Sequence, residues 1–135
     1  MDQGEQAVLD AYRRYWQIYI AVGSEMKLPD PRLAEVATGD ELRQLNGAFL
    51  SDQAAGQVLR GSIDLAPEVI ERTSDRALVR DCQASQILVI ERATGRPLGP
   101  APPERTLITV TMLRDQGVWK VGGIRHEGNG CSPAR

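Results

Sequence analysis

The spacing of apolar residues changes near residue 56, and this change limits the folds that the chain can adopt. Before residue 56, apolar side chains recur every three or four positions, which predicts helices. After it, they alternate or gather in β-branched runs, which predicts strands. Helices followed by strands, without βαβ alternation, indicate an α+β domain with three N-terminal helices packed on a curved antiparallel β-sheet. The 135 residues suit one domain, 1–135, with an ordered core over about 3–127.

The first helix is predicted over residues 3–27. Asp2 and Glu5 have capping-box spacing, which favours a helix start near residue 3. An apolar stripe follows at i, i+4, i+7, i+8 and i+11, and the pattern stops ahead of Pro29. Its members are Val8, Tyr12, Tyr15, Trp16 and Tyr19. Four of the six aromatic side chains therefore share one helix face.

Two further helices are predicted before residue 56. Asp30-Pro31 offers an N-cap followed by a proline at the first helical position, which favours a short helix through Val36. Thr38 and Glu41 repeat the capping-box spacing and predict the start of a third helix. The buried face of that helix would be formed by Leu42, Leu45 and Phe49.

An antiparallel meander of four long strands is predicted for the rest of the chain. The strands cover residues 58–73, 77–91, 105–114 and 118–125. Gly61 and Pro67 predict a bend or bulge in the first strand. Asp115-Gln116-Gly117 predicts a hairpin turn between the last two. We interpret the proline-rich segment 93–103 as a stiff, solvated hairpin end rather than a functional loop.

The order of these elements resembles the nuclear-transport-factor-2-like superfamily, which includes polyketide-cyclase-like and ketosteroid-isomerase-like proteins. The resemblance covers Glu5 to His126 and rests on the aromatic helix AYRRYWQIY, the PDP and ATG breaks, Arg60-Gly61, and Trp119 in the closing strand. It implies a cone-shaped, cystatin-like fold in which the sheet curls around the first helix and leaves a pocket. The superfamily contains enzymes and non-catalytic binding or assembly domains, so the fold does not decide the function.

Cys82 and Cys131 are the only cysteines, and we predict that they form a disulfide. The alternative is two independent thiols, but a lone thiol in the polar tail has no evident use, whereas a bridge would pin that tail to the sheet. A disulfide implies an oxidising compartment. Asp81-Cys82 in a strand, with a second cysteine after the last strand, also resembles bacterial extracytoplasmic members of the superfamily, which are often lipoproteins or anchored domains.

The start of the sequence leaves two locations open. Residues 1–5 show neither a charged n-region nor an apolar h-region, so the protein is either cytoplasmic or extracytoplasmic with its leader absent from this sequence. The cysteine pair favours the second location, secreted or lipid-anchored. Arginine outnumbers lysine fourteen to two, a bias typical of GC-rich bacterial genomes.

A ligand pocket is predicted beside the aromatic helix. Its expected residues are Tyr12, Tyr15, Trp16, Tyr19, Asp81 and Trp119, although the aromatic stripe and Trp119 are also what core packing alone would give. Asp81 and His126 are the acid–base candidates that the resemblance to the superfamily's enzymes brings forward. We expect His126 to be an ordinary surface histidine, and Asp81 to be able to form a structural ion pair or hydrogen bond instead.

Several other site classes are disfavoured. Arg60, Arg80 and Arg125 could meet on neighbouring strands and bind an anion, but arginine is abundant throughout the chain. Two cysteines and one histidine lack metal-ligand spacing, and no phosphate-binding loop or cofactor motif is present. A net charge of −2 without a basic face argues against nucleic-acid binding. No apolar run reaches the length of about 18 residues that spans a bilayer.

We therefore predict a non-enzymatic, extracytoplasmic binding or assembly domain with a pocket for a small apolar ligand, or with a protein partner. By resemblance, a homodimer through the sheet is expected. The alternative is a small cofactor-free isomerase, cyclase or dehydratase with Asp81 as general base and Tyr12, Tyr19 or His126 as its hydrogen-bond partner. That alternative requires the Asp81 carboxylate to point into a closed, mostly apolar cavity.

Overall fold

The three predicted helices are present in the computed structural model, which describes residues 2–100 and 104–133. They are α1 (Gln3–Glu25), α2 (Arg32–Val36) and α3 (Gly39–Ala54). Asp2 caps α1 by accepting a hydrogen bond from the backbone nitrogen of Glu5 at 2.7 Å, as the capping-box spacing predicted. The helix start predicted from Thr38 is confirmed, because Thr38 is the N-cap residue of α3. The capping box itself does not form: the Thr38 side chain makes no capping bond, and the Glu41 carboxylate accepts from Tyr15 instead.

The first two predicted strands are each divided where the sheet bends. The strands are β1 (Gln57–Arg60), β2 (Ile63–Asp64), β3 (Pro67–Arg72), β4 (Arg76–Ser85), β5 (Leu88–Glu91), β6 (Pro97–Leu98), β7 (Thr106–Asp115) and β8 (Val118–Asn129). The break between β1 and β2 lies at Gly61, whose φ is +133°. A β-carbon at Gly61 would lie 2.1 Å from the carbonyl oxygen of Gln86, in the link between β4 and β5. Only glycine fits this close backbone crossing, which explains the bend.

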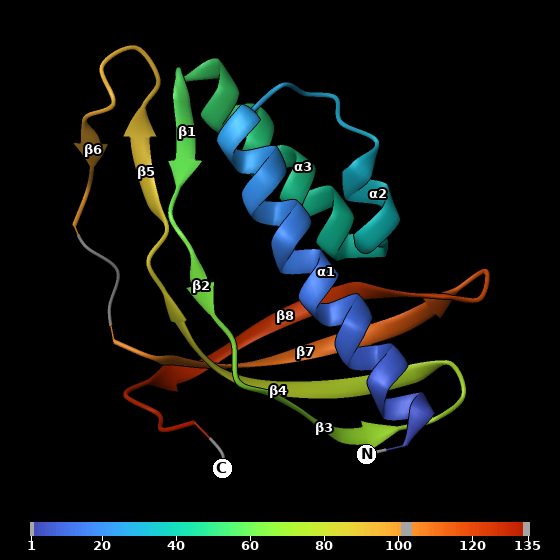
Figure 1. The fold of residues 1–135 in the computed structure, drawn as a ribbon. Helices are drawn as coiled ribbons and strands as arrows, with labels where there is room; N and C mark the ends of the chain where they lie inside the picture. Colours follow the sequence, from blue (N-terminus) through green and yellow to red (C-terminus); the bar gives the residue numbers. More distant parts are fainter. Residues whose placement is uncertain (1, 101–103, 134–135) are drawn as a thin grey trace.

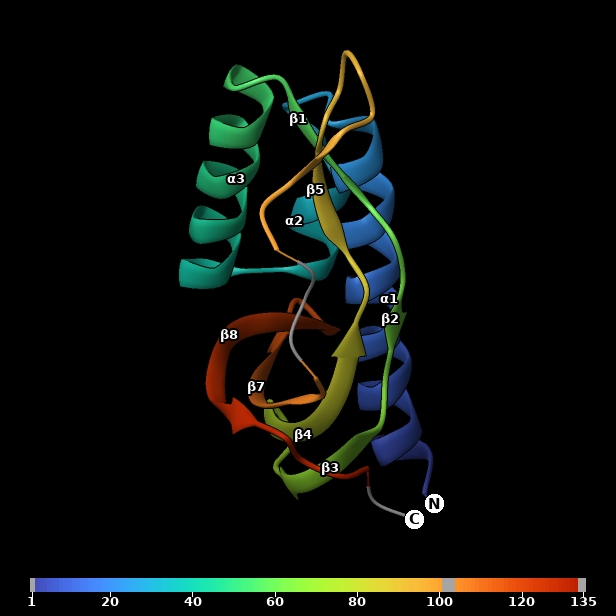
Figure 2. The ribbon, with the colours of Figure 1, turned by 90° about the vertical axis from the view of Figure 1, so that its left-hand side faces the viewer.

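All strand pairs within the sheets are antiparallel. One sheet has the order β2-β4-β7-β8, with β3 also pairing with β4, and the other has the order β1-β5-β6. Bulges between Val69 and Glu71 on β3, and at two points of the β7–β8 pair, increase the local twist. Figure 2 shows β4, β7 and β8 curling below α2 and α3 and beside the N-terminal half of α1. The predicted turn is a two-residue hairpin in which Gln116 and Gly117 both have positive φ.

Helix α1 lies across the concave side of the sheet, with α3 beside it (Figure 1). Its aromatic stripe is buried in the core together with apolar residues of α3, β1, β4 and β7. Trp119 is only 8% exposed, which confirms it as a core residue of β8. The segment 93–103 contains β6, and its residues 101–103 lie outside the described part of the chain.

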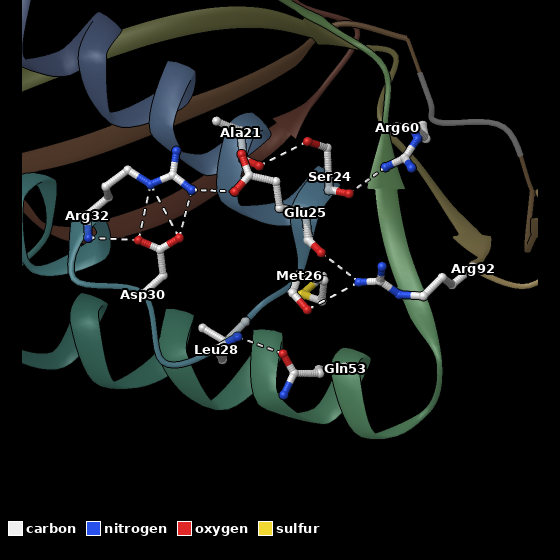
Figure 3. A network of polar contacts seen from close by, with 10 residues as sticks. All are labelled: Ala21, Ser24, Glu25, Met26, Leu28, Asp30, Arg32, Gln53, Arg60 and Arg92. Atoms are coloured by element: carbon white, nitrogen blue, oxygen red, sulfur yellow. Dashed lines mark hydrogen bonds and ion pairs between the residues drawn. The ribbon is translucent and has the colours of Figure 1, made fainter.

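The C-terminal end of α1 is held by side chains from β1, from the turn after β5 and from α3 (Figure 3). Arg60 donates to the carbonyl oxygen of Ser24 at 2.8 Å, and Arg92 donates to that of Glu25 at 2.6 Å. Gln53 of α3 accepts a hydrogen bond from the backbone of Leu28. The last turn of α1 has no basic residue, so these arginines supply the missing partners of its carbonyl groups.

The three arginines considered as an anion-binding site, Arg60, Arg80 and Arg125, do not come together. Arg60 donates to the end of α1 and lies on β1, which belongs to a different sheet from the strands of the other two arginines. Arg80 and Arg125 share a row across β4, β7 and β8 with Thr109 between them, and Arg125 bonds to Glu127 at 2.5 Å. The three guanidinium groups do not meet because the strand that carries Arg60 pairs with β5, not with β4.

Candidate functional site

A cleft of about 730 Å³ opens between the helices and the concave face of the sheet. Helix α1 contributes Tyr15, Trp16 and Tyr19, and α3 contributes residues from Glu41 to Ala48. The opposite wall carries four isoleucines, from β2, from the link between β4 and β5, from β7 and from β8: Ile63, Ile87, Ile108 and Ile124. Buried residues form its floor, and exposed residues such as Gln44, Ala48, His126 and Asn129 form its rim. This volume lies within the usual range for small-molecule sites.

Three aromatic rings of α1 form one side of the cleft. The Tyr15 and Trp16 ring centroids are 4.9 Å apart at an interplanar angle of 88°, and those of Trp16 and Tyr19 are 5.1 Å apart. Tyr19 also packs against Phe49 of α3, with 5.3 Å between centroids. Such edge-on packing holds the rings in fixed positions. Tyr15, Trp16 and Tyr19 thus lie where the sequence predicted a pocket wall.

A buried pair formed by Tyr15 and Glu41 also lines the cleft. The Tyr15 hydroxyl donates to the Glu41 carboxylate at 2.7 Å, and the two residues are 1% and 9% exposed. Burial raises the pKa of Glu41, and the hydrogen bond from Tyr15 offsets part of this change. Burial and the neighbouring Glu41 charge both raise the pKa of Tyr15. The sequence analysis missed Glu41 as a site residue because its position at the start of a helix was explained by capping.

Two buried nitrogen atoms at the cleft have no hydrogen-bond partner within residues 2–100 and 104–133. They are Nε2 of Gln83 on β4 and Nε1 of Trp16 on α1. The Trp16 indole lies close to the Tyr12 hydroxyl, where it favours the ionised form and lowers the pKa of that tyrosine, although less than burial raises it. Gln83 is 8% exposed, and its Nε2 atom has no hydrogen-bond partner among the described residues. An unpaired buried donor costs about 1–3 kcal/mol, so the Gln83 amide is a candidate for a ligand contact.

Tyr12 and Asp81 lie behind the cleft and do not line it. Both are fully buried, and the Tyr12 hydroxyl donates to one Asp81 oxygen at 2.5 Å. The other Asp81 oxygen accepts a bond from the backbone nitrogen of Ala66 at 2.7 Å. Burial, followed by the Asp81 charge, raises the pKa of Tyr12. This pair joins α1, β4 and the segment between β2 and β3 in the core.

His126 is separated from Asp81 by a whole strand. The register places Asp81 opposite Ile108 and Ile108 opposite His126, so β7 lies between the two candidates. Neighbouring strands are about 4.8 Å apart, so their backbones are about 10 Å apart, too far for a direct hydrogen bond. His126 lies within β8, which extends to Asn129, and its exposed side chain lies at the rim of the cleft. Trp119 also lies away from the cleft, beside Arg114.

The predicted disulfide joins Cys82 and Cys131, with 6.0 Å between their α-carbons. Side chains alternate along β4, so Cys82 faces away from the cleft while Asp81 and Gln83 face the concave side. The bridge pins the segment after β8 to the convex side of the sheet. Arg105 supports it by donating to the Cys82 carbonyl oxygen at 2.7 Å and by pairing with Asp64.

The described part of the chain shows neither a metal cluster nor a membrane-spanning helix. It brings together no cluster of three His, Cys, Asp or Glu side chains that could hold a metal ion. None of the helices found there is both long and apolar enough to cross a membrane.

Similarity to solved structures identifies the fold. The intermembrane space region of the chloroplast protein ARC6 matches with a TM-score of 0.71 and 15% identity, over 96% of this chain and 98% of that one. Two Nostoc punctiforme proteins of unknown function with a cystatin-like fold match with TM-scores of 0.50 and 0.52. Their identities are 12% and 14%, over 96% and 97% of this chain and 93% and 81% of theirs.

Similarity in sequence is limited. No family model matches the chain. UDP-glycosyltransferases 91D2 and 91D1 of Stevia rebaudiana are each 30% identical over 82 residues, which is 61% of this chain. The matched part spans only 17% of the length of each enzyme. The solved structures show that the chain has a cystatin-like fold, in agreement with the cone-shaped, cystatin-like fold that its element order predicted.

Proposed function

We propose that this domain is a non-enzymatic binding module whose cleft takes a small, largely apolar ligand. The observation that carries the proposal is the cleft itself, about 730 Å³ in volume and walled by three aromatic rings and four isoleucines. A pocket with mostly apolar walls and few buried polar groups gains affinity from burial of the ligand and selectivity from those polar groups. Glu41 and Gln83 are the buried polar groups here.

The arrangement of Asp81 favours binding over catalysis. A general base must come within hydrogen-bond reach of the proton that it removes. Both oxygens of Asp81 instead accept bonds from Tyr12 and Ala66, and the residue does not line the cleft. The alternative enzyme would need these bonds to break before Asp81 could meet a substrate.

We further propose that the domain works outside the cytoplasm, secreted or lipid-anchored. The Cys82–Cys131 disulfide supports an oxidising compartment. The solved ARC6 region, which shares the fold, is described as an intermembrane space region. Titration of free thiols on protein purified from its native host without reductant tests this location. We expect no free thiol per chain, and two free thiols would contradict the proposal.

Ligand binding in the cleft can be tested with the uncharged fluorescent probe N-phenyl-1-naphthylamine. We expect its emission to rise and shift to shorter wavelength on binding the wild-type protein. Ala48→Phe places a ring at the cleft rim and should weaken binding at least tenfold. Ala54→Phe is the matched control, because Ala54 is also exposed on α3 but does not line the cleft. No binding by the wild type, or equal binding by all three proteins, would reject the proposed function.

A further inference from the structure

We propose that the ligand of the cleft carries an uncharged hydrogen-bond acceptor, a ketone, ester or amide carbonyl, which Gln83 binds at the floor. This inference rests on the proposed function, because it names the chemical class of the molecule that fills the same cleft. It adds a specific contact to a site that is otherwise defined by its shape and its apolar walls.

The Gln83 side-chain amide is a hydrogen-bond donor that lacks an acceptor among the described residues. Gln83 is only 8% exposed, so it is more than nine-tenths buried, and it lines the cleft. Its Nε2 atom lies out of reach of solvent and has no partner among the described residues. The terminal torsion of a glutamine is broad and roughly two-fold, so the amide can turn its N–H toward the cleft without a change of rotamer. A carbonyl oxygen there would complete the missing hydrogen bond.

The charges around the cleft select an uncharged acceptor. Among the described residues that line it there is no lysine or arginine, and His126 is exposed at the rim. Among those lining residues, Glu41 carries the one buried carboxyl group, on the helix side of the cleft. A carboxylate or phosphate ligand would be desolvated at the floor without a buried cation to pair with, and it would face the negative charge of Glu41 when that group is ionised. A ketone, ester or amide avoids both costs.

The acceptor position follows from the sheet. Gln83 pairs with Thr106 on β7, and Asp81, two positions earlier on β4, pairs with Ile108. Gln83 and Ile108 are therefore diagonal neighbours on the concave face, with the rings of α1 on the opposite side of the cleft. A ligand with an apolar body against Trp16 and Tyr19 and a carbonyl directed to β4 would use both walls.

Three naphthalenes with substituents of equal heavy-atom number test the inference: 2-acetylnaphthalene, 2-isopropylnaphthalene and 2-naphthoate. Their dissociation constants are measured by displacement of N-phenyl-1-naphthylamine from the wild type and from the Gln83→Leu and Gln44→Leu variants. Gln44 is the matched control, because it lines the same cleft but is exposed at the rim.

We expect Gln83→Leu to reduce the preference for the acetyl over the isopropyl compound about tenfold, because it removes one satisfied hydrogen bond. Gln44→Leu should leave this ratio unchanged, and binding of the isopropyl compound by Gln83→Leu shows that the cleft is intact. Naphthoate should bind more weakly than the ketone at pH 7. An unchanged ratio in Gln83→Leu, or tighter binding of naphthoate, would overturn the carbonyl assignment while the binding function stands. If none of the three compounds displaces the probe from the wild type, the proposed function itself fails.

Discussion

At the residue scale, the hydrogen bond between Tyr12 and Asp81 is a structural contact with a measurable cost of removal. Tyr12→Phe would leave one oxygen of a fully buried carboxylate without a partner. We expect the free energy of unfolding to fall by about 2 kcal/mol. Tyr19→Phe is the control, since the described residues give the Tyr19 hydroxyl no hydrogen bond to lose and its ring remains. Urea titration measures both, and equal stability of the two variants would contradict the structural role.

The raised pKa of Glu41 predicts how the free energy of unfolding depends on pH. Burial raises its pKa in the folded protein above the ordinary value of 4.5. A carboxyl group with a raised pKa binds its proton more tightly when folded, so stability falls as pH rises from 4.5 through the raised pKa. Glu41→Gln keeps an oxygen that can accept from Tyr15 and removes this titration. We expect the stability of the variant relative to wild type to increase over that pH interval, as measured by urea unfolding at successive pH values. A constant difference would show that Glu41 does not titrate in this way.

At the element scale, the end of α1 depends on partners from distant segments. Arg92 donates to the carbonyl oxygens of Glu25 and Met26, and these bonds close the last turn of the helix. Arg92→Ala should lower the free energy of unfolding by about 1 kcal/mol and speed amide exchange in that turn. Arg96→Ala is the control, because Arg96 forms only a 3.6 Å ion pair at the surface, which contributes little. Equal effects of the two substitutions would argue against a role in holding the helix.

The helices and strands were predictable where the sequence pattern that indicates them is local. The period of the apolar stripe predicted α1 and three of the rings that line the cleft, because spacing along a helix fixes which side chains share a face. The division of the long strands was only partly predictable. Gly61 signalled a bend, but the close approach of Gln86 that requires it involves a residue far along the chain.

The polar part of the site was harder to predict for the same reason. Gln83 and Glu41 come from different elements, and nothing in their local sequence indicates that they face a common cleft. Asp81 was expected in the pocket, but its partner Tyr12 and the Ala66 amide enclose it in the core. The separation of Asp81 from His126 depends on strand order and register, which are set by long-range pairing.

At the scale of the whole molecule, we expect the disulfide to contribute more to the free energy of unfolding than any other single contact described above. It joins residues 49 positions apart. Replacing both cysteines, Cys82→Ser with Cys131→Ser, should lower the free energy of unfolding by about 4 kcal/mol if the bridge acts by restricting the unfolded chain. Urea unfolding of the double variant should match that of the reduced wild type. A double variant as stable as the oxidised protein would show that the bridge contributes nothing to the fold.

The same bridge also divides the molecule into two parts with different covalent connectivity. Residues 82–131 form a closed ring that holds the end of β4 and all of β5 to β8, whereas the three helices and β1 to β3 belong to an open segment. A single proteolytic cut inside the ring leaves both fragments joined, so the nicked protein keeps its full mass until it is reduced. A single cut between α1 and α2 leaves α1 attached only by packing and hydrogen bonds. The aromatic wall of the cleft therefore lies in the part of the molecule that a single proteolytic cut can detach.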